Sequence, residues 1–300
     1  MLASAPRRPS GSSTSTTAPP LRAASHQTTA DNPGLIPSPI IGPVVSFIDG
    51  NRPLVAQLGP RQLPGQNWSR PKVTQHTTVA AQSAEKGELV SQKMTITKVA
   101  GTAATYGGYV NVSRQDIDFT TPGIMDVIIN DLAAVYAVQT EAAAAAAFDA
   151  AAVAGVPIPT GAATAAAVQT SLWDAASKIY TATKGAGRVF AVTGPDMLSI
   201  LGPIFPPVNP QNAFSAGLSA GDFGTGLVGS ISGIPLYVSA GVGTLRMLVL
   251  STAGAEAYED RIGSLQVVEP SVLGIQVAYA GYFTPMVVEA TALVKIVKTP

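Results

Sequence analysis

The sequence lacks cysteine altogether and contains only two histidines in 300 residues. Without cysteine the chain has no disulfide, no thiolate nucleophile, no iron–sulfur cluster and no cysteine-bound zinc. The two histidines, His26 and His76, are far apart in the sequence. They leave little for an imidazole-rich metal centre or for a hydrolytic site built on histidine. We therefore expect no metal site, no cofactor and no histidine-dependent catalysis.

Charged residues are scarce as well. They make up 12% of the chain, whereas ordinary soluble domains contain about 25%. The 18 basic and 18 acidic residues give a net charge of zero, and a net charge near zero promotes association. Extensive permanent interfaces are depleted in charge. The composition therefore predicts an obligate oligomer, with a weakly charged monomer as the alternative.

Long hydrophobic runs are missing too. A transmembrane helix needs about 20 consecutive apolar residues. The best candidate, residues 142–159, is mostly alanine and is interrupted by Asp149. The first residues run straight into Pro, Ser, Thr and Arg, without the apolar stretch of a secretory signal. We expect no membrane segment, and synthesis in the cytoplasm.

The sequence does contain enough apolar material for a large core, since 46% of its residues are hydrophobic. Residues 1–33 are rich in Ser, Thr, Ala and Pro, carry three arginines and predict a flexible basic arm. In residues 34–66 prolines alternate with short apolar runs, which predicts extended chain. Residues 1–100 hold ten basic and four acidic residues, a surplus that would suit contact with another subunit or with nucleic acid, with simply solvated charge as the alternative. The arm has no aromatic residue, so sequence-specific recognition of nucleic acid is not expected.

Residues 67–113 have the period-2 pattern of β-strands. Residues 72–79 and 93–99 alternate in this way, and a polar turn with a glycine at residues 84–88 separates them. The segment is therefore predicted to form a long hairpin. Neither strand has enough large apolar residues on one face to form a core of its own. Because an isolated hairpin is marginal in water, we expect this one to lie on something else.

A strong helix start follows at residues 120–122, where two threonines and a proline precede Asp126. Apolar residues then recur at helical spacing from Ile124, and an alanine run extends the predicted helix to about Ala154. About 30 residues at 1.5 Å each span about 45 Å, far more than the usual helix. A second helix is predicted at residues 162–184, where a glycine follows as its stop.

The remainder of the chain alternates short strands with short helices. The predicted strands are residues 189–193, 234–239, 245–251, 265–268, 273–282 and 286–297. The predicted short helices are residues 194–201 and 253–258, and residues 202–230 form a loop rich in Gly, Pro and Phe. This order predicts an α+β fold rather than regular βαβ units.

Two glycine-rich strings match motifs of enzymes. Gly224, Gly226 and Gly229 have the spacing of a dinucleotide-binding loop, but no predicted strand leads into them and no helix follows to receive a pyrophosphate. Ser219 stands in a G-x-S-x-G string, whose serine needs a histidine after it in the chain. No histidine follows His76. We therefore expect neither a nucleotide site nor a serine nucleophile.

Four aspartates gather near the start of the long helix, namely Asp116, Asp118, Asp126 and Asp131. Carboxylates in such a group are the residue type of acid–base pairs and of divalent-cation sites. Helix capping explains them more simply. The sequence contains no catalytic constellation, and we do not expect an enzyme.

A flexible arm, an extended hairpin, a long alanine-rich helix and an α+β region with a glycine loop follow one another along this chain. Residues 110–117, which run into the helix start at Pro122, resemble the junction between the E-loop hairpin and the spine helix of tailed-bacteriophage major capsid proteins. Residues 229–238 resemble a recurrent strand of that family, with the pattern G-x-x-x-G-hydrophobic-P-hydrophobic. Residues 34–298 are thus similar to the Hong Kong 97-type capsid fold, and the order of elements is the more specific signal.

This resemblance implies a domain organisation within the α+β class. It places a flexible basic arm at residues 1–33, an extended N-arm at 34–66, the E-loop hairpin at 67–113, a peripheral domain with the spine helix at 114–187 and 266–300, and an axial domain at 188–265.

The resemblance also implies a function. Copies of the chain would assemble as hexamers and pentamers into the icosahedral head of a virion, around double-stranded DNA that is contacted non-specifically. Scaffolding, portal and decoration proteins would be further partners. Some family members cross-link an E-loop lysine to an asparagine of a neighbour. Lys86 is the candidate here, although an ordinary surface lysine is the simpler interpretation. Contacts between copies are expected at Trp68, Lys72, Lys86, Glu88 and Arg114.

Three alternatives stay open at this point. An encapsulin-like cellular compartment has the same fold but encloses a cargo enzyme rather than DNA. A nucleotide-binding enzyme would use the loop from Gly224 to Gly229. A secreted adhesion protein is suggested by the Ser, Thr and Pro content of the arm, and the missing signal opposes it.

Overall fold

The computed structural model describes residues 51–119, 124–159, 161, 163–205, 227–270 and 273–299. Several predictions fall outside these residues. They are the flexible arm, most of the extended N-arm, the helix start at residues 120–122, the serine string around Ser219 and the glycines Gly224 and Gly226.

The long helix α3 (Ile124–Ala151) has 28 residues and spans about 42 Å. Its second half is the alanine run, the residue type with the highest helix propensity. There Ala144, Ala145 and Phe148 form the buried face. The predicted long helix is thus confirmed, but it ends before Ala154. The following residues form the short strand β5 (Val153–Ala154), which pairs with a strand near the C-terminus.

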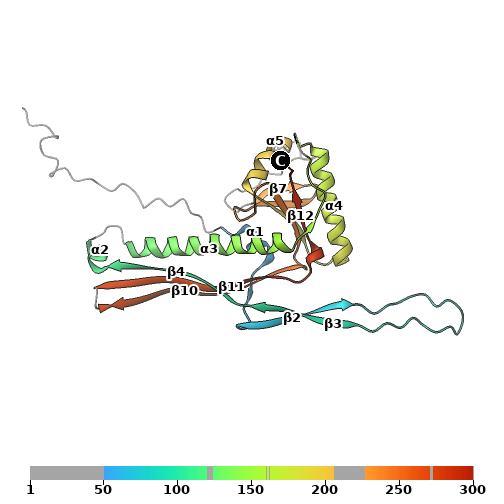
Figure 1. Ribbon diagram of the computed structural model, residues 1–300, viewed down its shortest axis with the longest axis horizontal. Helices are drawn as coiled ribbons and strands as arrows, with labels where there is room; N and C mark the ends of the chain where they lie inside the picture. The colour runs from blue at the N-terminus through green and yellow to red at the C-terminus, as the bar shows by residue number, and fades with distance from the viewer. Residues whose placement is uncertain are drawn as a thin grey trace, which may run out of the picture. The chain divides into compact units, whose positions relative to one another are not determined.

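The long helix lies along a four-stranded sheet (Figure 1). The strand order is β1 (Arg61–Gln62), β10 (Ala255–Glu269), β11 (Gly274–Val287) and β4 (Ala104–Ser113). The approach is close because the sheet offers small residues to the helix. A side chain at Gly281 would come within 2.6 Å of the Tyr136 hydroxyl.

The prediction of a short helix at residues 253–258 is wrong. Residues 255–258 begin β10, whose partners in β11 extend without a break from Ala255 to Arg261 and resume after a bulge. Alanine and glutamate favour a helix locally, but the 15-residue strand satisfies its backbone groups against β11.

A second, six-stranded sheet carries the main core. Its order is β5, β12 (Leu293–Val297), β9 (Arg246–Ser251), β6 (Val189–Thr193), β8 (Ile234–Val238) and β7 (Leu227–Ile231). Successive residues of β9 point to opposite faces. Met247 and Val249 pack beneath α4 (Ala165–Thr183) and α5 (Pro195–Ile204), whereas Leu248 and Leu250 face α1 (Pro53–Leu58) and α3. Burial on both faces explains the unbroken apolar run of this strand.

The predicted strand at residues 189–193 and the two shorter helices are confirmed, with small shifts at the helix ends. The prediction of one strand over residues 286–297 is wrong. The chain turns there through a short 3-10 helix (Ala290–Ala292), so that β11 and β12 belong to different sheets. We expected α4 and β12 in one domain with the long helix. Instead β12 is a strand of the six-stranded sheet, and α4 packs on that sheet.

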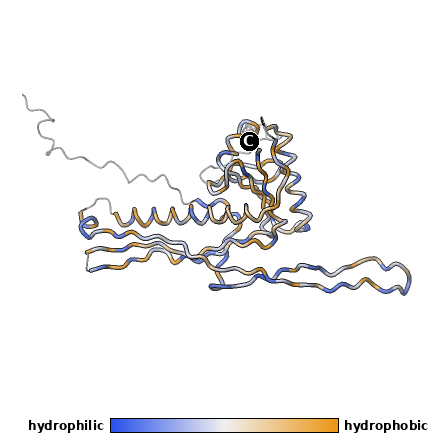
Figure 2. The backbone as a smooth tube through the Cα atoms, in the orientation of Figure 1, coloured by the Kyte–Doolittle hydropathy of each residue, from blue (hydrophilic) through white to orange (hydrophobic). Residues whose placement is uncertain are grey.

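The predicted hairpin is present but shorter at its base than expected. Strands β2 (Asn67–Gln75) and β3 (Thr95–Thr102) form a separate two-stranded sheet. Residues 104–113, expected within the hairpin, form β4 of the four-stranded sheet instead. Residues 76–94 continue beyond the paired strands, and all of them except Gly87 are exposed. Figure 2 shows hydrophobic and hydrophilic residues interspersed along this segment.

Candidate assembly surfaces

The root of the β2–β3 hairpin is packed on the end of the four-stranded sheet. The rings of Trp68 and Tyr258 lie 5.2 Å apart. Trp68 pairs across the hairpin with Gly101, where any side chain would come within 2.6 Å of the indole. A hydrogen bond of 2.8 Å from the Thr284 hydroxyl to the carbonyl of Thr102 adds a second tie. These contacts fix the direction in which the hairpin leaves the body of the protein.

Ion pairs reinforce the same junction. A carboxylate oxygen of Glu256, on β10, lies 2.9 Å from Arg61 and 3.1 Å from Arg70. Lys72, on β2, lies 2.6 Å from Glu289, between β11 and the short 3-10 helix. The carboxylate of Glu256 is almost fully buried, so its two arginines compensate a charge that would otherwise be costly.

The ionisation of this junction follows from its contacts. Burial acts to raise the pKa of Glu289, but the ammonium of Lys72 and the hydrogen bonds of Thr291 outweigh it and hold that pKa below its ordinary value. Burial raises the pKa of Tyr258, and its hydrogen bond to Glu256 adds to the effect. Glu289 is therefore charged and Tyr258 is neutral at neutral pH.

The tip of the hairpin, unlike its root, is exposed to solvent. Lys86 adopts a left-handed conformation with φ of 65°, and the Gly87 N–H donates to the carbonyl of Ala84 at 2.9 Å. Lys86 and Glu88 are both exposed. Exposed apolar side chains flank the tip on both sides, namely Val79, Leu89, Val90 and Met94.

A buried acid on the long helix holds the start of α1. Glu141 is 4% exposed. Its carboxylate accepts hydrogen bonds from the backbone N–H groups of Leu54 at 2.8 Å and Val55 at 3.1 Å, and from the hydroxyl of Ser239 at 2.8 Å. A carboxylate at a helix N-terminus is favourable because the first N–H groups lack partners within the helix. Glu141 thereby joins α1, α3 and the six-stranded sheet.

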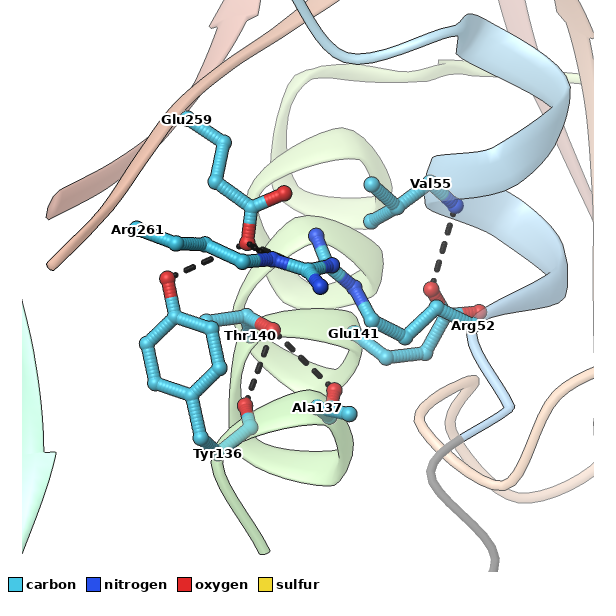
Figure 3. A network of polar contacts seen from close by, with 8 residues as sticks. All are labelled: Arg52, Val55, Tyr136, Ala137, Thr140, Glu141, Glu259 and Arg261. Atoms are coloured by element: carbon cyan, nitrogen blue, oxygen red, sulfur yellow. Dashed lines mark hydrogen bonds and ion pairs between the residues drawn. The ribbon is translucent and has the colours of Figure 1, made fainter. Parts of the chain in front are cut away.

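A second buried acid, Glu259, accepts hydrogen bonds from three side chains (Figure 3). Arg52 lies at 2.6 Å, Arg261 at 3.0 Å and the Tyr136 hydroxyl at 3.1 Å. Burial acts to raise the pKa of Glu259, but the two arginines hold it below its ordinary value. Burial and the neighbouring carboxylate together raise the pKa of Tyr136. The network fastens the chain just before α1 to both the helix and the sheet.

The residues predicted as assembly contacts occupy different environments. Trp68 and Lys72 lie at the hairpin root, Lys86 and Glu88 lie at its tip, and Arg114 begins α2 (Arg114–Phe119) with a 3.0 Å ion pair to Asp118. Their contacts with a neighbouring copy stay a prediction. Sequence reasoning missed Glu256, Tyr258 and Glu289. The first two fell in the wrongly predicted helix, and nothing local marks Glu289 as the partner of a distant lysine.

Neither a metal site nor a membrane-spanning helix is found in the part of the chain that the structure describes. No group of three or more His, Cys, Asp or Glu side chains is placed to hold a metal ion there. No helix among the described residues is long and apolar enough to span a membrane.

A long helix on a four-stranded sheet, a projecting hairpin and a six-stranded sheet with helices on it form the architecture of shell-forming capsid proteins. The model of the phage capsid protein family matches residues 96–296. The chain belongs to this family, and it is a structural capsid protein with the Hong Kong 97-type fold.

Solved structures agree on the fold at low sequence identity. The chain is similar to a structure from Gordonia phage Cozz, with a TM-score of 0.66, 15% identity, and coverage of 95% of this chain and 99% of that one. It is also similar to the capsid of a native GTA particle, with a TM-score of 0.67, 12% identity, and coverage of 92% and 100%. For the capsid of cyanophage P-SCSP1u the values are 0.65, 14%, 89% and 94%. No curated protein matches the sequence.

Proposed function

We propose that copies of this chain assemble as hexamers and pentamers into an icosahedral phage head that encloses double-stranded DNA. The observation that carries the proposal is the β2–β3 hairpin. Its root is fixed on its own chain by Trp68 and by the ion pairs of Arg70 and Lys72. Residues 76–94 extend beyond that root, are exposed except for Gly87, and present apolar side chains to solvent.

A hairpin of this kind needs a second surface. Two strands alone are marginally stable in water, and groups of exposed apolar side chains mark sites of protein contact. The contact is supplied by an adjacent copy, on which the tip with Lys86 and Glu88 would lie. The low charge of the whole chain, 12% of its residues, supports extensive contact between copies.

The family's domains can be assigned on this basis. The hairpin at residues 67–102 is the E-loop, α3 with the four-stranded sheet is the peripheral domain, and the six-stranded sheet with α4 and α5 is the axial domain. The chain would be made in the host cytoplasm and located in the virion, with scaffolding, portal and decoration proteins as further partners. The role is structural and involves no catalysis.

The test is electron microscopy of the purified full-length chain, together with the absorbance ratio at 260 and 280 nm of the largest particles. Icosahedral shells that contain DNA would support the proposal. Shells filled with protein would indicate an encapsulin-like compartment instead. A uniform monomer, even after co-expression with a capsid scaffolding protein, would contradict a shell function.

A further inference from the structure

The four-stranded sheet ends in an edge strand that lacks the features by which proteins protect such edges. β4 is ten residues long and contains neither a charged residue nor a proline. It is the last strand in the order of its sheet, and among the described strands none pairs with its outer side. Natural sheets blunt exposed edges with charges, proline or bulges, because an open edge is a template for pairing with another chain.

The other long edges do carry such features. The edge strand β2 contains Arg70, Pro71 and Lys72, and its partner β3 contains Lys98. β10 is paired with β1 on its outer side at residues 258 and 259, and it contains a bulge at residues 261–263 in its pairing with β11. Within the described ranges, the contrast singles out β4 as the long edge that is open to pairing.

The hydrogen bonds at its two ends show which backbone groups of β4 point outward. The N–H of Arg114 donates to the carbonyl of Leu273, on the β11 side, at 2.9 Å, and the N–H of Ala103 donates to Gln66, on the opposite side, at 2.8 Å. Because bonding direction alternates along a strand, the even-numbered residues of β4 pair with β11. The odd-numbered residues direct their N–H and C=O groups outward, and these are Thr105, Gly107, Tyr109, Asn111 and Ser113.

We propose that two copies of the chain pair through β4, antiparallel and about a two-fold axis. The inference rests on the proposed shell, in which copies of the chain meet. A two-fold contact uses the same surface on both copies, and β4 is the long edge that neither repels nor sterically blocks its own duplicate. The pairing continues each four-stranded sheet into that of the second copy, as in strand addition to a sheet edge.

The side chains indicate the register. Tyr109 is 73% exposed and belongs to the outward set. With Tyr109 of each copy opposite Gly107 of the other, the absent side chain of glycine leaves room for each ring. In the same register Thr105 of one copy lies opposite Asn111 of the other.

The natural absence of cysteine makes this register testable. A full-length chain with Thr105→Cys and Asn111→Cys is purified, brought to assembly and oxidised mildly, and the products are separated on a non-reducing gel. We expect a disulfide-linked dimer as the main product. The matched control carries Leu265→Cys and Val267→Cys on β10, which are also exposed, and is expected to stay monomeric on the gel.

A charge exchange tests the same contact without cysteine. Tyr109→Lys and Tyr109→Glu place like charges across the two-fold axis, so each alone should lower the yield of particles severalfold. A mixture of the two variants brings opposite charges together and should restore it. Equal yields from all three preparations would contradict the pairing.

The outcomes of the cysteine experiment separate this proposal from the shell function. Dimers on the gel support the pairing, and they do so even if microscopy finds no shells, in which case the shell function fails by itself. Shells without dimers overturn the pairing and leave the shell function intact. A chain with Val45→Cys and Asn111→Cys tests whether the N-terminal segment covers the edge instead. A disulfide in that chain, with no dimer from the first variant, would overturn the proposal.

Discussion

The six-stranded sheet and the β2–β3 hairpin are both built from strands, yet they differ in what stabilises them. β9 and β6 bury both faces, with Phe190 and Leu248 fully enclosed. The hairpin exposes both faces beyond Gln75, and Leu89 near its tip is 66% exposed. The sheet therefore stabilises the subunit by itself, whereas the outer hairpin gains stability only when another molecule covers it.

The largest effect should come from removing the uncovered part of the hairpin. Gln75 and Thr95 pair at the end of the two-stranded sheet, so residues 76–94 can be replaced by Asn-Gly, a two-residue hairpin turn. We expect complete loss of shells by electron microscopy and an unchanged circular dichroism spectrum and thermal midpoint of the subunit. Intact shells from this variant would show that the hairpin makes no essential contact.

The reverse change removes a side chain from the sheet and leaves the hairpin intact. Phe190→Ala opens a cavity in a fully buried site and should lower the free energy of unfolding by about 3–5 kcal/mol. The matched control, Leu89→Ala at the exposed tip, should change it by less than about 0.5 kcal/mol. Urea unfolding of both variants measures the difference. Similar losses in the two variants would contradict the comparison.

The contact of α1 with the long helix and the six-stranded sheet can be weakened by a smaller step. Glu141→Gln keeps the size of the side chain but removes the charge that accepts from Leu54, Val55 and Ser239. Hydrogen bonds to charged groups contribute about 1.5–3 kcal/mol, and we expect a loss of unfolding free energy in that range. Ser239→Ala removes one of the three donors and serves as the milder control. A Glu141→Gln variant as stable as the wild type would show that the carboxylate does not hold α1.

Sequence reasoning succeeded where the signal is local. The alanine run of α3, the apolar strand β6 and the polar turn near Lys86 each carry their own pattern, and all three were predicted. It failed where partners distant in sequence decide the structure. The strand at Ala255 exists because of β11, which begins beyond the next turn of the chain.

The candidate assembly surfaces also combine residues that the sequence marks locally with residues that only the fold brings together. Trp68 and Lys72 were predicted as contacts between copies, and the structure shows that both also hold the hairpin root on their own chain. Their partners Tyr258 and Glu289 could not be inferred, because no pattern in the sequence connects residues that meet only through the fold.

The smallest expected effect is a change in the free energy of unfolding at acidic pH. It compares the buried network around Glu259 with the exposed tip of the hairpin. The arginines beside Glu259 hold its pKa below the ordinary value of 4.5. The unfolded chain therefore takes up this proton first, so the stabilisation is fully present above about pH 4.5 and is lost as the pH falls through the lowered pKa.

Glu259→Gln should be less stable than the wild type at pH 7, and the difference should shrink below pH 4.5. Leu89→Ala, at the exposed tip, removes no titratable group and should keep the pH dependence of the wild type. Urea unfolding between pH 3 and 7 measures all three chains, and a constant gap between wild type and Glu259→Gln would mean that the arginines do not stabilise the ionised carboxylate.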